Sequence, residues 1–447
     1  MSDGVAARAL SRAVDVRPAE VAGLLAAFCY HFLLFTAYYI LRPIRDSMGV
    51  GGGAENLPDL FGWTLLCMLV AVPVFGWISG RFRRAVFLPW IYVFFAAHLV
   101  GFWAFFILHD RDEATARVFF VWASVFNLFV IAVFWSFMAD LFDRDQGKRL
   151  FAFITAGASV GGMLGSAITA FLATSVGEVN LLLVSAALLT ATLAPMRYLI
   201  GWSARQEARG ERIAERPIGG NPFAGVKLVL SSPYLGGIAV FVFLMSGVTT
   251  VLYLQQAGLL KIYYPDGDAR SSFLGSIELT MNIITIALQF FAVGRLTKQV
   301  GVATMIVVVP IFVVAGFLLI AAHPTFVTLV CVLVARRVGQ YAIVRPCREM
   351  LYTTVDRESK YKAKNVNDTL VYRTSDFVVA KVQESVQTAL QASLAGMALF
   401  GAGIAAAWAV VAWFLGRALE RMAPASIQGD AHLEIERSPR RGGDVSR

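Results

Sequence analysis

The sequence predicts an all-α membrane protein in which twelve transmembrane helices form two six-helix bundles. The first observation is composition: mean hydropathy is +0.66, and 57% of the 447 residues are hydrophobic while 15% are charged. This balance excludes an ordinary soluble protein. The second is a set of apolar blocks long enough to cross a membrane. The third is a repeated charged loop, DRDQGK at 143–148 and DRESK at 356–360, which follows the fourth apolar block of each half and indicates duplication.

The apolar blocks match the roughly 20 helical residues that cross a hydrocarbon core. Twelve of them are centred near Phe32, Leu69, Val93, Phe129, Gly161, Leu188, Phe243, Ile284, Val309, Val334, Val382 and Trp408. The eleventh contains Arg373, Asp376, Lys381 and Glu384 and would escape a hydropathy scan. It is nevertheless predicted as a span, because without it the C-terminus would fall on the wrong side of the membrane.

Cations gather in every second loop, and this pattern predicts the orientation. They follow the second, fourth, sixth, eighth and tenth blocks and include Arg81, Arg84, Lys148, Arg149, Arg205, Arg295, Lys298 and Lys360. Loops rich in Lys and Arg stay in the cytoplasm. Both termini are therefore expected on the cytoplasmic side of a bacterial inner membrane. The net charge of +9 follows from this topology, and its spread over several loops gives no reason to expect a nucleic-acid partner.

The expected segment boundaries follow from these blocks. The first apolar run has full spanning length and no small-residue cleavage site, so it is expected to be a retained span. Between the halves, Arg and Glu alternate before a stretch with Pro and Gly, which predicts a connector ending in a short amphipathic helix around 226–230. The predicted segments are an N-terminal tail at 1–19, bundles at 20–200 and 234–417, a cytoplasmic connector at 201–233, and a disordered tail at 418–447.

The sequence does not predict an enzyme, a cofactor or a metal site. Its cysteines, Cys29, Cys67, Cys331 and Cys347, show no paired spacing, so disulfides and zinc are not expected. The sequence also contains no phosphate-binding glycine loop ending in Lys-Ser/Thr and no His-Glu-x-x-His motif. An ATPase or a metalloprotease is therefore not supported.

Polar residues follow one helical face of the first block. His31, Tyr38, Arg42 and Arg45 repeat at i, i+7, i+11 and i+14. An ionisable group at the membrane centre costs roughly 2.5–3.5 kcal/mol on insertion scales, so this stripe is expected to face partners or water. Pro43 removes a backbone donor and is expected to disturb the helix, as in the broken helices of many transporter sites. The stripe could also be a helix end that reaches water, with His31 as a packing group.

Three later blocks carry polar stripes as well. The eighth has Glu278, Asn282, Thr285 and Gln289 on one face. The eleventh has Asp376, Gln383 and Gln387, with Arg373 and Glu384 at the edges. The tenth has Arg336, Arg337 and Gln340, followed by Arg345 and Arg348. Because guanidinium groups bind phosphate or carboxylate in a bidentate manner, this excess of arginine predicts an anionic ligand.

The same charges also have a structural interpretation. They could form structural or gating ion pairs that never touch a substrate, namely Arg45–Asp46, Arg348–Glu349, Arg373–Asp376 and Lys381–Glu384. Glu278 could make a structural hydrogen bond to a neighbouring helix or take part in proton coupling. The sequence leaves these alternatives open.

Six spans, a charged connector and six further spans resemble the major facilitator superfamily. GWISGRFRR at 76–84 resembles the loop motif of that superfamily, with Gly80 in the place of its Asp, and GRLTKQVG at 294–301 stands at the matching position in the second half. The resemblance implies gating roles for Arg81, Arg84, Arg295 and Lys298. In the superfamily a glycine-rich fifth span packs against the opposite half, and the fifth block here carries Gly157, Gly161 and Gly165.

Two further segments resemble the ATP/ADP translocases of plastids and intracellular bacteria and their free-living bacterial relatives. They are YYILRPIRD at 38–46 and, after the tenth block, REMLY at 348–352 followed by ESKYKAK at 358–364. The resemblance implies a nucleotide or anion exchanger, with Arg45 standing where that family has a Lys that would contact phosphate.

We therefore interpret the chain as a monomeric secondary transporter that works by alternating access on a small organic anion, such as a nucleotide or another phosphorylated metabolite. Its partners are the lipid bilayer and this substrate. The expected substrate-binding residues are Tyr38, Arg42, Arg45, Asn282, Arg336, Arg337 and Gln340. The expected coupling and gating residues are Asp46, Arg81, Arg84, Glu278, Arg295, Lys298, Arg348, Arg373, Asp376, Lys381 and Glu384. The alternatives are a proton-coupled exporter of drugs or neutral metabolites and a non-transporting sensor or assembly factor.

Overall fold

The structure is a computed structural model that describes residues 15–81, 84–109, 112–208, 224–289, 291, 296 and 299–422. The described residues form helices and no strand. Eleven helical segments among them are long and apolar enough to cross a membrane. The twelfth span is α17 (Tyr372–Leu390), the polar segment that the sequence places eleventh in the chain. The twelve predicted helices are thereby confirmed.

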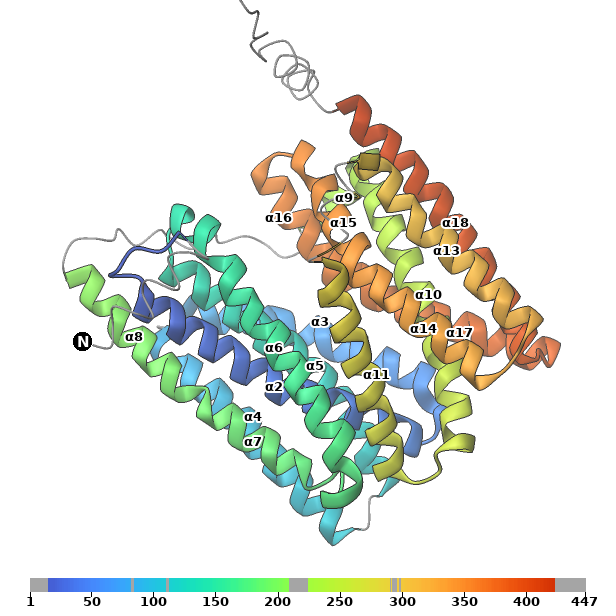
Figure 1. The fold of residues 1–447 in the computed structure, drawn as a ribbon, viewed down its shortest axis with the longest axis horizontal. Helices are drawn as coiled ribbons and strands as arrows, with labels where there is room; N and C mark the ends of the chain where they lie inside the picture. Colours follow the sequence, from blue (N-terminus) through green and yellow to red (C-terminus); the bar gives the residue numbers. More distant parts are fainter. Residues whose placement is uncertain are drawn as a thin grey trace, which may run out of the picture.

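The helices divide into an N-terminal and a C-terminal bundle (Figure 1). The N-terminal bundle comprises α2 (Val21–Gly51), α3 (Leu57–Arg81), α4 (Arg84–Leu108), α5 (Glu113–Leu141), α6 (Arg144–Val176), α7 (Leu181–Ala191) and α8 (Leu193–Ala208). The C-terminal bundle comprises α10 (Pro233–Tyr263), α11 (Gly267–Leu288), α13 (Val302–Ala322), α14 (Phe326–Gly339), α15 (Arg345–Leu351), α16 (Arg357–Val366), α17 and α18 (Leu394–Met422). The helix predicted around 226–230 is α9 (Ala224–Ser231), which packs on α16.

Each bundle has its own apolar core. Tyr30 and Phe134 are fully buried in the N-terminal core, and Phe317 and Trp408 are buried in the C-terminal core. Lipid removes most of the hydrophobic drive between spanning helices, so close van der Waals packing of these large side chains holds each bundle together. Each half of the duplicated sequence therefore forms a bundle with its own core.

A third apolar cluster joins the bundles at one end of the molecule. It combines Val50, Leu57 and Phe120 of the N-terminal bundle with residues of the C-terminal bundle that include Leu260 and Phe326. This end carries the α2–α3 connection at 52–56 and the α10–α11 connection at 264–266, and we call it the closed end. From here the bundles diverge toward the opposite end, where α9 and α16 lie (Figure 1).

Polar contacts reinforce the closed end. The buried Arg270 of α11 donates through Nε to the hydroxyl of Ser47 in α2 at 3.1 Å. The backbone nitrogen of Glu178, just after α6, donates to Asp268 at 2.9 Å, and the hydroxyl of Ser271 donates to the Glu178 carboxylate. These bonds connect the two bundles, so this end can open only if they break.

The fifth span packs against both bundles, and its glycines face its own bundle. A Cβ at Gly157 of α6 would lie 2.7 Å from the carbonyl oxygen of Phe28 in α2, so only glycine allows the two backbones to come this close. Gly161 and Gly165 lie against the same helix. The expected packing of the fifth span against the opposite half is present, but these three glycines lie against α2 and not at that contact. α6 reaches the C-terminal bundle further along, where Ala170 meets α11.

The helix break expected at Pro43 does not occur. α2 continues as one helix from Val21 to Gly51 with Pro43 inside it. The irregular backbone lies instead in two π-helical segments, η3 (Gln340–Val344) between α14 and α15 and η5 (Asn367–Val371) between α16 and α17. Such π-helical segments occur mostly as single-turn bulges and are frequent at functional sites.

The repeated charged loops are helix N-termini. Asp143 accepts a hydrogen bond from the backbone nitrogen of Gln146 at the start of α6, and Asp356 accepts one from Ser359 at the start of α16. Near the first loop, Glu20 accepts from the guanidinium of Arg149 at 3.0 Å. Burial raises the pKa of Glu20, but hydrogen bonds from Arg149, Arg17 and Gln146 outweigh burial and hold it below the ordinary value. This contact stabilises the fold above the pKa of the unfolded carboxyl and is lost as pH falls through the folded pKa.

The contact between α6 and α11 leads to a first prediction. A Cβ at Gly275 would lie 2.7 Å from the backbone nitrogen of Ala170, and neither backbone can retreat without separating the bundles. Overpacking of this kind costs about 1–3 kcal/mol. We therefore expect Gly275→Ala to lower the midpoint of thermal unfolding in detergent by several degrees.

Gly403→Ala in α18 is the matched control, because nothing lies within 4 Å of a Cβ there. Alanine is favoured over glycine in a helix by about 1 kcal/mol, so this variant is expected to be as stable as the parent or more so. Equal stability of the two variants would contradict the close contact.

Candidate functional site

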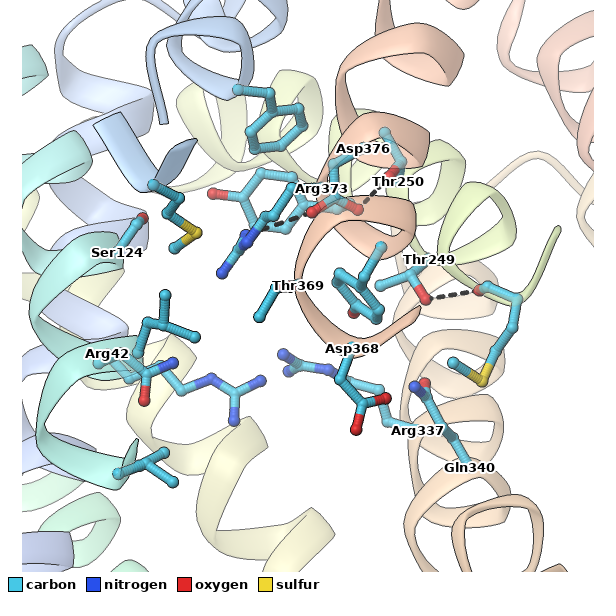
Figure 2. A pocket seen from close by; sticks show the side chains of 18 of the residues that line it. Arg42, Ser124, Thr249, Thr250, Arg337, Gln340, Asp368, Thr369, Arg373 and Asp376 are labelled. Carbon is cyan, nitrogen blue, oxygen red and sulfur yellow. Dashed lines mark hydrogen bonds and ion pairs between the residues drawn. The ribbon is translucent and has the colours of Figure 1, made fainter. Parts of the chain in front are cut away.

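A cavity of about 470 Å³ lies between the bundles and is lined by side chains from both. In Figure 2, Arg42 and Ser124 of the N-terminal bundle face Arg337, Asp368, Arg373 and other residues of the C-terminal bundle. Seven arginines line it: Arg42, Arg45, Arg336, Arg337, Arg345, Arg348 and Arg373. So many guanidinium groups in a cavity at membrane depth are costly unless they have partners.

Fewer carboxylates than arginines are available as those partners. Among the described residues, four acids form ion pairs with these arginines alone: Asp46, Glu278, Asp368 and Asp376. Glu349 is a fifth, at 3.8 Å from Arg348, but it also pairs with Lys364 at 2.7 Å. Seven arginines against four carboxylates leave three positive charges in excess.

Glu278 of α11 joins two arginines from different bundles. Its Oε1 lies 2.5 Å from Nη1 of Arg337 in α14 and 3.4 Å from Nε of Arg42 in α2. One carboxylate therefore offsets two guanidinium groups, and it links the bundles at the cavity wall.

A second link crosses the bundles at Asp46. Arg45 Nη2 lies 2.6 Å from Asp46 Oδ1, and the hydroxyl of Tyr253 in α10 donates to the same oxygen at 3.2 Å. The guanidinium of Arg45 also lies 5.3 Å from the centre of the Phe120 ring, close enough for a cation–π contact. These contacts hold Arg45 in the cavity wall.

Asp376 of α17 is bound by three donors. The hydroxyls of Ser246 and Thr250 in α10 donate to Oδ1 at 2.6 and 3.1 Å, and Arg373 donates to Oδ2 at 3.2 Å. Figure 2 shows this group at the edge of the cavity, with Asp376 between Arg373 and Thr250. These donors fix the position of the Asp376 carboxylate at the cavity wall.

Two arginines have no carboxylate partner among the described residues. Arg336 is only 3% exposed, donates to the hydroxyl of Thr249, and has an Nε without a hydrogen-bond partner there. Arg345 stacks over the ring of Tyr341, with its guanidinium carbon 5.6 Å from the ring centre. Arg345 is exposed, whereas the unsatisfied Nε of Arg336 is a buried charged donor, which costs about 1–3 kcal/mol or more. An anion entering the cavity would supply the missing acceptors.

Most of the residues predicted from the sequence meet at this cavity. Those that line it are Tyr38, Arg42, Arg45, Arg336, Arg337, Gln340, Arg348, Arg373 and Asp376. Asp46 and Glu278 bind arginines that line it. The four ion pairs considered from the sequence, Arg45–Asp46, Arg348–Glu349, Arg373–Asp376 and Lys381–Glu384, are all present.

Some predicted residues lie elsewhere. Asn282 does not line the cavity, because its amide turns into the contact with α6 and donates to Ser166 at 3.3 Å. Lys381 pairs with Asp59 of α3 at 2.6 Å, and Glu384 lines a separate cavity of about 750 Å³ at the closed end. Arg81 is exposed at the end of α3. Arg295, Lys298 and the side chain of Arg84 fall outside the described residues.

The structure also brings in residues that the sequence did not indicate. Tyr253, Tyr341 and Asp368 line the cavity, as does a row of residues on α5. Tyr253 sits in a block that is otherwise an ordinary apolar span, and Tyr341 lies beside Gln340 in the polar stripe of the tenth block. A signal did exist in the fourth block, because Ser124 and Asn127 interrupt an otherwise apolar helix on one face.

Comparison with known proteins agrees with this architecture. The family model of the Major Facilitator Superfamily matches residues 13–348. ADP,ATP carrier protein 1 of Chlamydia muridarum is 23% identical over 424 residues, which cover 79% of this chain and 80% of that protein. The protein of the same name from Chlamydia pneumoniae is 23% identical over 436 residues, which cover 82% and 85%.

Solved structures share the fold at low sequence identity. A bacterial homologue of the human lysosomal transporter Spinster, in an inward-facing and unoccupied conformation, has a TM-score of 0.58 at 13% identity and covers 92% of this chain and 100% of that one. The nucleoside transporter NupG has a TM-score of 0.57 at 12% identity and covers 90% and 99%. The family model spans well over half of the sequence, and the twelve helices form the two bundles that the family shares. This chain belongs to the Major Facilitator Superfamily.

Proposed function

We propose that this protein is a secondary active transporter that exchanges phosphorylated small organic anions, with nucleotides as the first candidates, across a bacterial inner membrane. Substrate binds in the cavity between the bundles, and rocking of the bundles exposes the cavity to each side in turn. A gradient of counter-substrate supplies the energy. No catalytic step is required.

The excess of arginine in the cavity carries the proposal. Among the described residues, the arginines of the cavity exceed their paired carboxylates by three charges, which matches an anion of several negative charges better than a neutral or cationic compound. Arg336, whose buried Nε has no partner among the described residues, would gain most from a phosphate, and the exposed Arg345 beside Tyr341 offers a further guanidinium group. The names of the relatives, ADP,ATP carrier proteins of Chlamydia, support a nucleotide as that anion.

The proposed orientation follows from the cations in alternate loops. Both termini and the connector at 201–233 then lie in the cytoplasm, with bundles at 20–200 and 234–417 and a tail at 418–447. In this orientation the closed end faces away from the cytoplasm, and the conformation is inward-facing. We propose a monomer as the working unit, since each chain contains a complete cavity.

Glu278 is the proposed switch between the empty and the loaded carrier. Its carboxylate holds Arg42 and Arg337 together across the bundles. A phosphate that binds these arginines competes with Glu278 and releases one of the links between the bundles. Arg45, Asp46, Arg373 and Asp376 form the remaining charged wall, and Asp376 is the candidate for coupling to protons if exchange is not the energy source.

Loss of Arg336 tests the anion site. Because Arg336 pairs with no described carboxylate, Arg336→Gln leaves no acid unpaired and is expected to keep the unliganded unfolding temperature close to that of the parent. Hydrogen bonds to charged groups are worth about 1.5–3 kcal/mol, so binding of ADP should weaken by roughly 10- to 150-fold. Thermal unfolding of the purified protein across an ADP titration measures both quantities.

Arg205→Gln is the control, because Arg205 lies on α8 away from the cavity and contacts Tyr198. Its binding of ADP is expected to match the parent. If cationic or neutral compounds stabilise the parent while phosphorylated anions do not, an exporter takes the place of the proposed exchanger.

Loss of Glu278 tests the switch. Removing one member of a buried ion pair costs about 3–5 kcal/mol, so Glu278→Gln is expected to lower the unliganded unfolding temperature. Pyrophosphate can replace the missing carboxylate between Arg42 and Arg337, so it should raise the unfolding temperature of the variant by more than that of the parent. A smaller rise in the variant would show that the anion does not compete with Glu278.

A further inference from the structure

The cavity has a second wall whose chemistry differs from that of the arginines. One face of α5 contributes seven cavity-lining residues, and none is charged: Phe120, Ser124, Asn127, Leu128, Ile131, Ala132 and Trp135. Their spacing of three, four and one positions is that of a single helical face. We call this row the α5 wall.

The two walls divide the cavity by chemistry. Five of the lining arginines come from α14, α15 and α17 of the C-terminal bundle, and the other two come from α2. The α5 wall offers apolar and aromatic surface with two small polar groups. In Figure 2, Ser124 of this wall lies across the cavity from Thr249, Arg337 and Gln340. A ligand that filled both sides would need an anionic part and an uncharged part.

Asn127 is the polar feature of the α5 wall that points to a ligand. Its side-chain oxygen is buried and has no hydrogen-bond partner among the described residues. The assignment of O and N in an amide follows from its hydrogen bonds, so either group can face the cavity. Buried polar atoms are nearly always paired, and an amide whose oxygen lacks a partner, with a donor beside it, suits the edge of a nucleobase, as asparagine reads adenine in DNA.

Trp135 supplies a fixed aromatic surface on the same face of α5, further along the helix from Asn127. Its ring is held edge-on by His31 at 5.4 Å and by Phe151 at 5.5 Å between ring centres, and it remains partly exposed. These neighbours limit its rotation, so a planar group can stack without first ordering the side chain.

We propose that the α5 wall is a subsite for a nucleobase, which Asn127 contacts by its amide and Trp135 by stacking. This inference rests on the proposed function, because the phosphates of the same ligand occupy the arginines. A nucleotide then contacts both the arginines and the α5 wall, whereas a bare phosphate anion contacts chiefly the arginines. The subsite thus determines which phosphorylated anions bind tightly.

Comparing ADP with inorganic pyrophosphate tests the subsite. Stacking of a base on an aromatic side chain is worth about 1–3 kcal/mol, so the full chain in detergent should bind ADP roughly 5- to 150-fold more tightly than pyrophosphate in calorimetry. Asn127→Leu and Trp135→Leu should each remove most of this preference and leave pyrophosphate affinity within about twofold. AMP and ribose 5-phosphate, which differ by the base alone, should show the same pattern.

Trp90→Leu is the matched control, since Trp90 is 70% exposed on α4 and does not line the cavity. It should keep the preference for ADP. The subsite is overturned if the parent binds ADP and pyrophosphate equally, or if both α5 variants weaken the two anions alike. If neither anion binds the parent, the proposed function fails and the subsite fails with it.

Discussion

The rest of the structure depends on the need to hold seven guanidinium groups inside a membrane-embedded bundle. Each would be unfavourable in hydrocarbon, so each must lie where a carboxylate, a hydroxyl, an aromatic face or water can reach it. The helices that carry arginine therefore face the space between the bundles. Lipid-facing surfaces are left to residues such as Trp90 and Phe171, which are 70% and 72% exposed. This requirement is met at the cavity, and its remaining positive charge is the basis of the proposed anion site.

Two similar motifs supply much of the positive charge of the cavity. They lie in spans that are not equivalent in the two halves of the duplicated sequence. Arg42-Pro-Ile-Arg45-Asp46 lies in the first span, and Arg345-Pro-Cys-Arg348-Glu349 lies at the end of the tenth. The structure brings both to one cavity, and in each the second arginine pairs with the acid that follows it, at 2.6 Å for Arg45 and 3.8 Å for Arg348. The first motif lies within one continuous helix, and the second follows a π-helical segment. The same chemistry is therefore presented on two different backbones.

The sequence predicts the spans well because length and hydropathy decide them, and it finds α17 through the topology that its neighbours require. It predicts the local pairs Arg45–Asp46 and Arg373–Asp376 because close spacing on one helix places the partners together. It does not predict that Glu278 bridges Arg42 and Arg337, since that depends on how the bundles are rotated against each other. Asn282, one turn from Glu278, turns into α6 for the same reason.

α17 has a consequence for how the chain is made. Its helix includes Arg373, Asp376, Lys381 and Glu384, and charged residues of these kinds carry insertion penalties of roughly 2.5–3.5 kcal/mol each near the helix centre. Such a segment cannot leave the translocon for lipid by itself. It packs between α3 and α10, both of which precede it in the chain, and its charges find Asp59, Ser246 and Thr250 there. α17 is therefore synthesised after the helices that it packs against. It inserts next to those helices, whose polar groups replace the lipid as its surroundings.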